Sequence, residues 1–247
     1  MKLHLSLKLL FACCWYTCFA SAQRVAQDTS NYAIAIQSAI DAYQQYLSPQ
    51  TSLYNGVEYI NYANTINEGS PFFDYKFQLG SVTYDGIWYQ HVPIIYDEVL
   101  GEVVIKDVYG RGDILLNTQK VSGFSLLEHN FVKLSPATTG SPQIRPGFYD
   151  VLYQGKTGVY LRQTKKILET LNVSSGVSRV IDVQNDYFIR KGPIFYSVNN
   201  KHDVLKVVND KKKEIQQFIR KNKLNLRQGK TAALIKVAAY YDQLTNK

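Results

Sequence analysis

Ser81-Val82-Thr83-Tyr84-Asp85-Gly86-Ile87-Trp88-Tyr89-Gln90 contains the turn around which the rest of the predicted fold is arranged. Asp-Gly accepts the positive φ angles of a two-residue turn, so the runs on either side are expected to pair as an antiparallel hairpin. Directly opposed residues share a face of the sheet. The register therefore puts Tyr84 opposite Ile87 and Val82 opposite Tyr89 on the face expected to pack in the core, with His91 at its end.

Similar short β-branched and aromatic runs, separated by turn residues, extend from about residue 57 to residue 198. Further hairpins are predicted from Ile94–Tyr96 to Val103–Ile105, from Phe148 to Leu161, and from Tyr187–Ile189 to Ile194–Tyr196. About ten to twelve strands result, and so many would leave long edges in a flat sheet. We therefore expect a curled sheet, a barrel or a two-sheet sandwich, with the loop at 136–146 separating two sub-sheets.

The two ends of the chain have helical periodicity instead. Residues 30–47 are predicted to form a helix or a loosely held arm. Residues 203–245 are predicted to form a basic helical pair, with a break at Asn209-Asp210. The expected class is α+β: a mostly antiparallel sheet with an N-terminal helix and a C-terminal helical pair packed on it, all within one domain at 23–247.

Residues 1–22 have the three parts of a signal peptide. Lys2 and Lys8 supply the positive start, residues 9–20 supply an apolar run, and Ala20-Ser21-Ala22 supplies small residues for cleavage. The run is too short to cross a bilayer, so no transmembrane span is expected. A lipid anchor on Cys13 is disfavoured, because Phe11 stands where a small residue is usual. All three cysteines precede residue 23, so the mature chain is expected to be exported, to the periplasm or beyond, without disulfides.

The positive charge is concentrated near the end of the chain. The formal net charge is +8, and residues 201–247 contain 12 basic and 4 acidic side chains. The candidate anion-binding residues are Lys211, Lys212, Lys213, Arg220, Lys221 and Arg227. They are expected to face anionic envelope components or to form a solvated helix face. An exported protein meets little nucleic acid, so no nucleic-acid partner is predicted.

Several segments together resemble one family: Tyr54-Asn55-Gly56-Val57-Glu58-Tyr59, Gly80-Ser81-Val82-Thr83-Tyr84-Asp85-Gly86, Val92-Pro93-Ile94-Ile95-Tyr96-Asp97, residues 210–224 and Tyr240-Tyr241-Asp242-Gln243-Leu244. They are similar to a family of uncharacterised exported proteins from bacteria of the Bacteroidota type. The resemblance spans most of the predicted mature chain. It implies a Gram-negative envelope protein and implies no activity.

Nucleotide, cofactor and metal signatures are absent from the sequence. Two Gly-Lys-Thr triplets begin at Gly155 and Gly229, but Asp150 and Leu224 stand where a phosphate-binding loop has its first glycine. Only three histidines follow residue 22, and they are far apart in the sequence. We therefore predict neither a cofactor nor a metal site.

Candidate catalytic and ligand-binding residues are few. His91, Asp85 and Asp97 are the best available candidates for a hydrolase, although His91 is better explained by packing at the margin of the core. Trp88 and Tyr89 are candidates for stacking on a ligand, although aromatic residues also serve packing in strands.

Three functions remain as expectations. The first is a non-catalytic envelope protein that acts as a structural, interaction or ligand-binding module. The alternatives are a hydrolase whose site is assembled from scattered residues, and anion-dependent attachment to the envelope surface through the C-terminal helices. Substrate, partner and oligomeric state do not follow from the sequence.

Overall fold

The computed structural model describes residues 34–36, 38–39, 52–172 and 176–246. The chain divides into two compact units, residues 1–48 and residues 49–247. In the first unit the described residues, 34–36 and 38–39, are helical, and the rest of the helix or arm predicted at 30–47 lies outside the described residues. The predicted signal peptide at 1–22 lies outside the described residues.

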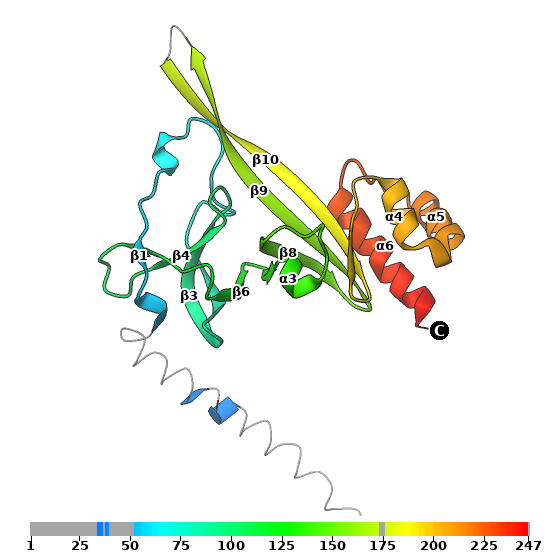
Figure 1. The fold of residues 1–247 in the computed structure, drawn as a ribbon, viewed down its shortest axis with the longest axis horizontal. Helices are drawn as coiled ribbons and strands as arrows, with labels where there is room; N and C mark the ends of the chain where they lie inside the picture. The colour runs from blue at the N-terminus through cyan, green and yellow to red at the C-terminus, as the bar shows by residue number, and fades with distance from the viewer. Residues whose placement is uncertain (1–33, 37, 40–51, 173–175, 247) are drawn as a thin grey trace, which may run out of the picture. The chain divides into compact units, whose positions relative to one another are not determined.

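The second unit is α+β, with an eleven-stranded antiparallel sheet among its described residues (Figure 1). The spatial order is β1-β5-β4-β3-β2-β6-β7-β8-β9-β10-β11. The strand bounds are β1 Val57–Glu58, β2 Gln78–Tyr84, β3 Ile87–Asp97, β4 Glu102–Lys106, β5 Asp113–Leu115, β6 Val121–Leu126, β7 His129–Leu134, β8 Gly147–Gln154, β9 Thr157–Asn172, β10 Gly176–Lys191 and β11 Ile194–Ser197. The fold class is confirmed, and of the three sheet forms considered the open, curled sheet is the one observed.

The β2–β3 hairpin has the predicted register. Val82 pairs with Tyr89, and Tyr84 pairs with Ile87. Asp85 and Gly86 have φ angles of 53° and 80°, as a two-residue turn of this hand requires. Val82, Tyr84 and Tyr89 are buried, so the predicted face is the core face. Ile87, predicted on the same face, is 50% exposed because it lies at the turn end of the hairpin.

The position of His91 departs from the prediction. The pairing of β2 with β3 shifts between Gly80 and Val82, which inserts an extra residue on β3. His91 has a φ of 53° and is exposed rather than packed at the margin of the core. A β-bulge re-aims the side chain beside it, and no turn signal in the sequence marks this one.

The main core lies inside the curl of the first seven strands. It contains Val82, Ile94, Tyr96, Phe124, Leu126 and Phe131 from these strands, together with Phe148 from β8. The rings of Phe124 and Phe131 are stacked with their centroids 4.6 Å apart, and the ring of Tyr96 contacts that of Phe148 edge to face with a centroid distance of 5.9 Å. Such contacts add to the stabilisation that burial provides.

The segment at 136–146 does not separate two sub-sheets, because β7 pairs directly with β8 across it. It contains the short helix α3 (Pro136–Thr139), which begins with a capping box at Ser135. Ile144 from this segment is fully buried against Tyr149, Phe188 and Phe195 on one face of β8–β11. The segment therefore covers this part of the sheet.

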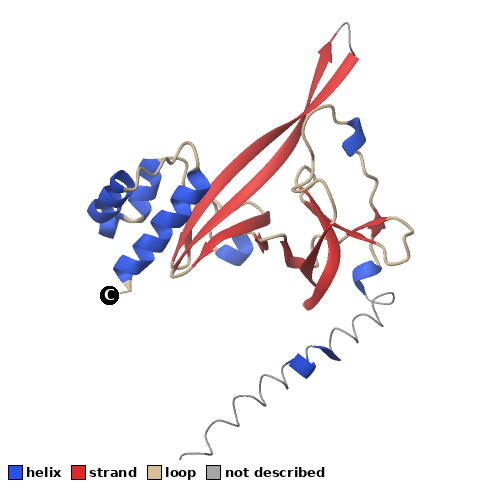
Figure 2. Cartoon of the chain, turned by 180° about the vertical axis from the view of Figure 1, so that it is seen from behind, coloured by secondary structure: helices blue, strands red, loops and turns tan. Residues whose placement is uncertain are grey.

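The C-terminal helices are α4 (Lys201–Val207), α5 (Lys212–Lys221) and α6 (Lys230–Thr245), with a 3-10 turn at Asn209–Lys211 at the predicted break. They gather beside the base of the β9–β10 hairpin (Figure 2). Leu234, Val237 and Tyr241 of α6 are buried in one cluster with Val159 and Ile189 of the strands. Among the described residues, no helix has the length and apolar character needed to cross a bilayer.

Asp242 joins α6 to the turn between β8 and β9. Its carboxylate accepts hydrogen bonds from the Thr157 amide at 3.0 Å, the Thr157 hydroxyl at 2.8 Å and the Tyr153 hydroxyl at 3.1 Å. Gly155 lies against the same carboxylate, where a Cβ would overlap it. The helix is therefore held by buried polar bonds as well as by its apolar stripe.

We expect Asp242→Asn to lower the free energy of unfolding by about 2–4 kcal/mol, because the amide cannot accept all three bonds and leaves a buried donor unpaired. The matched control is Asp182→Asn, because Asp182 lies on β10 and has no hydrogen-bond partner among the described side chains. This control should change the free energy of unfolding by less than about 0.5 kcal/mol. Urea unfolding of both variants measures the difference. Equal stability of the two variants would contradict this role for Asp242.

Candidate functional site

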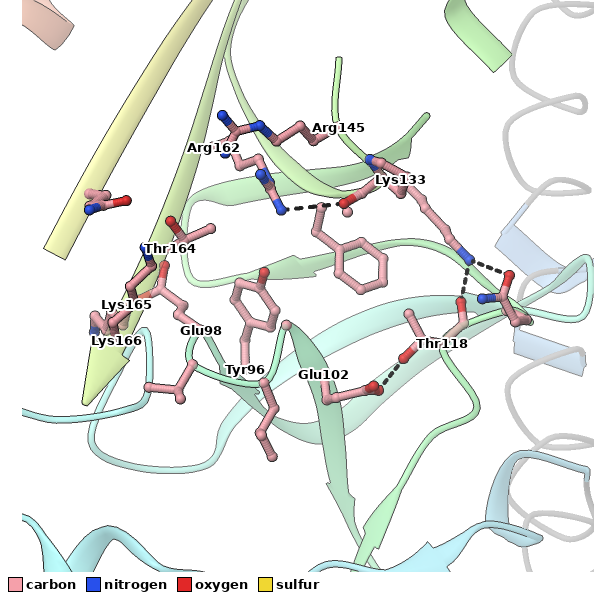
Figure 3. Close-up of a pocket in the computed structure, with 18 residues that line it drawn as sticks. Tyr96, Glu98, Glu102, Thr118, Lys133, Arg145, Arg162, Thr164, Lys165 and Lys166 are labelled. Carbon is pink, nitrogen blue, oxygen red and sulfur yellow. Dashed lines mark hydrogen bonds and ion pairs between the residues drawn. The ribbon is translucent and has the colours of Figure 1, made fainter. Parts of the chain in front are cut away.

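A basic groove lies where the end of β3, β7, the segment before β8, and β9 come together (Figure 3). Its volume is about 440 Å³. The charged residues that line it are Glu98, Glu102, Lys133, Arg145, Arg162, Lys165 and Lys166. Cations thus outnumber carboxylates by five to two.

Four of these cations have no carboxylate partner in the described part of the chain. Among the described residues, none of Lys133, Arg145, Arg162 and Lys166 forms an ion pair. Lys133 Nζ donates to the Thr118 carbonyl at 2.6 Å, and Arg162 donates to the Pro146 carbonyl at 3.3 Å. These bonds hold the side chains in place without neutralising them. The groove therefore has a positive potential that an anion would lower.

Tyr96 contributes a hydrogen-bonding group at the centre of the groove. The residue is only 4% exposed, and its ring packs against Phe124, Phe131 and Phe148. Figure 3 shows its hydroxyl pointing into the hollow, where it has no hydrogen-bond partner among the described residues. Burial raises the pKa of Tyr96 well above its usual value of 10, so the hydroxyl keeps its proton and remains a donor.

Glu98 and Lys165 form the inner wall of the groove. Lys165 Nζ lies 2.9 Å from Glu98 Oε2 and also donates to the Phe72 carbonyl at 2.6 Å. Both side chains are largely buried, and the Lys165 amide donates to the Glu98 carbonyl at 3.1 Å. The side-chain amide nitrogen of Gln163 lies 3.1 Å from Glu98 Oε1 and can donate a hydrogen bond to it. Burial raises the pKa of Glu98 above its usual 4.5, and Lys165 only partly opposes this.

An acidic cavity of about 220 Å³ lies on the other side of this wall. Its lining residues are Phe73, Tyr96, Glu98, His129, Phe131, Phe148, Asp150, Leu152, Leu161, Gln163 and Thr231. His129 Nδ1 lies 2.6 Å from Asp150 Oδ2. The Asp150 side chain is 6% exposed and that of His129 is 41% exposed. Burial raises the pKa of Asp150, and the hydrogen bond with His129 opposes the rise.

The three residues considered for catalysis are not brought together. His91 and Asp97 are six positions apart on β3, roughly 20 Å along the strand direction. Asp85 lies in the turn before β3, and the four positions from Ile87 to His91 extend roughly 13 Å away from that turn. Asp97 is fully buried and accepts bonds from Tyr59 and Tyr62 and from the amides of Val99 and Leu100. Asp85 forms an exposed ion pair with Lys120. These contacts give Asp97 a structural role and Asp85 a position in a turn.

Trp88 and Tyr89 do not form one ligand surface. They are adjacent on β3 and project to opposite faces, with Tyr89 buried in the core and Trp88 51% exposed. The preference of strands for aromatic packing therefore accounts for Tyr89.

The predicted basic residues near the end of the chain divide into two groups. Lys212, Lys213 and Lys221 are exposed on α5, and Lys211 precedes them. Arg220 and Arg227 instead line a hollow of about 630 Å³ with Lys201, His202 and Lys223. The helical pair thus has a basic hollow beside a basic helix face.

The residues of the groove and the cavity were not identified from the sequence. Arg145 lies in the segment predicted to be a loop, and Arg162, Lys165 and Lys166 belong to a charged run that does not have the apolar alternation of a strand. His129 and Asp150 meet because β7 pairs with β8, with Phe131 opposite Asp150. A sequence signal existed for each strand but not for this register, because the connection between them is long.

No group of three or more His, Cys, Asp or Glu side chains in the described ranges is arranged to hold a metal ion. Comparisons with protein-family models, with curated proteins and with solved structures find no significant match to this chain. The chemistry of the groove and the cavity must therefore be inferred from their own residues.

Stability should depend on pH through Glu98. Its pKa is raised in the folded state, so between the ordinary and the raised pKa the folded protein binds more protons than the unfolded chain. The contribution of Glu98 to stability is thus fully present below its ordinary pKa and is lost as pH rises through the raised one. We expect the stability of the wild type minus that of Glu98→Gln to decrease as the pH rises above the ordinary pKa of Glu98.

Denaturant unfolding of both proteins at each pH measures this difference. Carboxylates common to both proteins largely cancel in the comparison. A difference that increases with pH would contradict the raised pKa of Glu98.

Proposed function

We propose that this chain is an exported, non-catalytic protein of the cell envelope that binds an anionic ligand in the basic groove. The observation that carries the binding proposal is the Tyr96 hydroxyl, which points into a hollow lined by cations and has no hydrogen-bond partner among the described residues. Among the described residues no buried side-chain oxygen or nitrogen lacks a partner, so this hydroxyl is open to the hollow and can donate to a ligand oxygen there. Export is supported by the pattern of residues 1–22 and by the family resemblance.

The ligand class follows from the donors. Arg162 and Arg145 present guanidinium groups, which match the planar geometry of carboxylate and phosphate oxygens. Phe148 and Tyr96 add apolar surface to the same hollow. This combination suits an organic acid or a phosphorylated or carboxylated sugar better than a bare inorganic ion.

Binding is favoured over hydrolysis by the surroundings of the His129–Asp150 pair. A histidine held by a buried carboxylate is an arrangement that hydrolases use to activate a hydroxyl. Among the described residues, no hydroxyl forms a hydrogen bond with His129, and the Thr231 hydroxyl is paired with that of Tyr187 at 2.8 Å. The pair therefore supports an enzyme less well than the groove supports a binding protein.

The binding proposal is tested by calorimetric titration with glucose 6-phosphate, glucuronate and uncharged glucose. We expect the two anions to bind and glucose not to bind, with affinity falling as salt is raised. Arg162→Gln should weaken binding by about tenfold or more, and Tyr96→Phe by about three- to tenfold. Because the Tyr96 hydroxyl has no hydrogen-bond partner to lose among the described residues, Tyr96→Phe should change stability by less than about 0.5 kcal/mol.

Lys236→Gln, an exposed position on α6 outside the groove, is the matched control and should bind like the wild type. Equal affinity for glucose and its phosphate, or no loss in Arg162→Gln, would overturn the proposal.

Attachment to an anionic surface is the second candidate, and the hollow shared by Arg220 and Arg227 favours it. We expect the double variant Arg220→Gln/Arg227→Gln to be retained less by vesicles containing anionic lipid at low salt, whereas Arg162→Gln is retained like the wild type. Co-sedimentation with vesicles measures retention. If the double variant and the wild type sediment equally, the attachment function is wrong.

A further inference from the structure

We propose that the acidic cavity is a second binding site, which takes a small organic ammonium ion about the size of a single ring. The site is separate from the basic groove and would take a ligand of opposite charge. Its parts come from the segment before β2, the end of β3, strands β7, β8 and β9, and the first turn of α6.

The size of the cavity sets the size of the ligand. Its volume of about 220 Å³ is somewhat larger than the ~150 Å³ engineered cavity that accommodates benzene. One ring with a short substituent therefore fits. The exposed edge of His129 lies at the opening, so a ligand can enter without unfolding the sheet.

The walls suit a cation. The ring centroids of Phe73 and Phe131 are 5.2 Å apart, and both rings line the cavity together with that of Phe148. The faces of aromatic rings attract ammonium groups, most strongly where water is excluded. An anion would instead meet these rings and two carboxylates, so the lining disfavours it.

Asp150 is the group that the cation would meet. In the described part of the chain its carboxylate has one hydrogen-bond partner, His129, although a carboxylate has about four acceptor positions. The raised pKa of Asp150 shows that this partner does not fully offset its burial. An ammonium N–H would supply the missing donor and the compensating charge.

The other charged groups around the cavity are already paired. The ammonium of Lys165 is taken up by Glu98 and by the Phe72 carbonyl. Lys230, next to Thr231, donates to the Asn199 carbonyl and lies 4.6 Å from the Tyr187 ring. Neither is bound to Asp150, so the carboxylate keeps its capacity for a ligand.

The test is a titration with three probes of nearly equal shape: benzylamine, benzyl alcohol and benzoate. We expect benzylamine to bind at least tenfold more tightly than benzyl alcohol, and benzoate not to bind. Asp150→Asn should weaken benzylamine binding by at least tenfold while changing benzyl alcohol binding by less than threefold. Asp182→Asn is the matched control and should bind like the wild type.

A second variant covers the case in which Asp150→Asn does not fold. Leu152→Phe places a larger side chain at the cavity wall and should abolish binding of every probe. Arg162→Gln should leave benzylamine binding unchanged, which distinguishes this site from the groove. Equal affinity for the amine and the alcohol, tighter binding of benzoate, or no binding of benzylamine to the wild type would each overturn the proposal.

Discussion

The contact between Glu98 and Lys165 is the interaction on which the rest of the site depends. Five neighbouring strand pairs separate β3 from β9 in the sheet, yet the Lys165 amide donates to the Glu98 carbonyl and the two side chains form a buried ion pair. The Glu98 amide also donates to the Pro71 carbonyl. The ladder does not close there, so these few bonds hold the curl. Such a pair adds modest net stability when intact, but removing one partner leaves a buried charge.

The same contact separates two hollows of opposite charge. Tyr96, Glu98 and Phe148 line both, with unpaired cations on one side and the Asp150 carboxylate on the other. Because the Glu98 and Lys165 side chains are largely buried, charges on the two sides of the wall are screened less than they would be in water. A change in the wall would therefore alter both hollows, whereas Arg162 and Leu152 belong to one each.

The C-terminal helices complete the acidic cavity as well as covering the strands. Asp242 holds α6 to the turn between β8 and β9, and the Thr231 hydroxyl bonds to that of Tyr187 on β10. The Thr231 bond fixes the first turn of α6 at the cavity wall, and the Asp242 bonds hold the other end of the helix. The basic residues of the C-terminal helices lie on the exposed side of α5 and in the hollow lined by Arg220 and Arg227. The positive charge concentrated at the end of the sequence and the positive charge of the basic groove therefore belong to different surfaces.

The β2–β3 hairpin, the strand-rich middle and the helical pair could be predicted from the residues, because an Asp-Gly turn and apolar periodicity are local properties. The bulge at His91 could not be predicted, because it arises from the pairing of β3 with β2 and no residue type in the sequence marks it. Nor could the groove and the cavity. Arg162 and Lys165 lie on β9, a strand of 16 residues whose charged half is extended because it pairs with β10 along its whole length. His129 meets Asp150 only through the register in which β7 pairs with β8. Side chains distant in the sequence become neighbours through strand pairing and curl, and these are properties of the whole sheet.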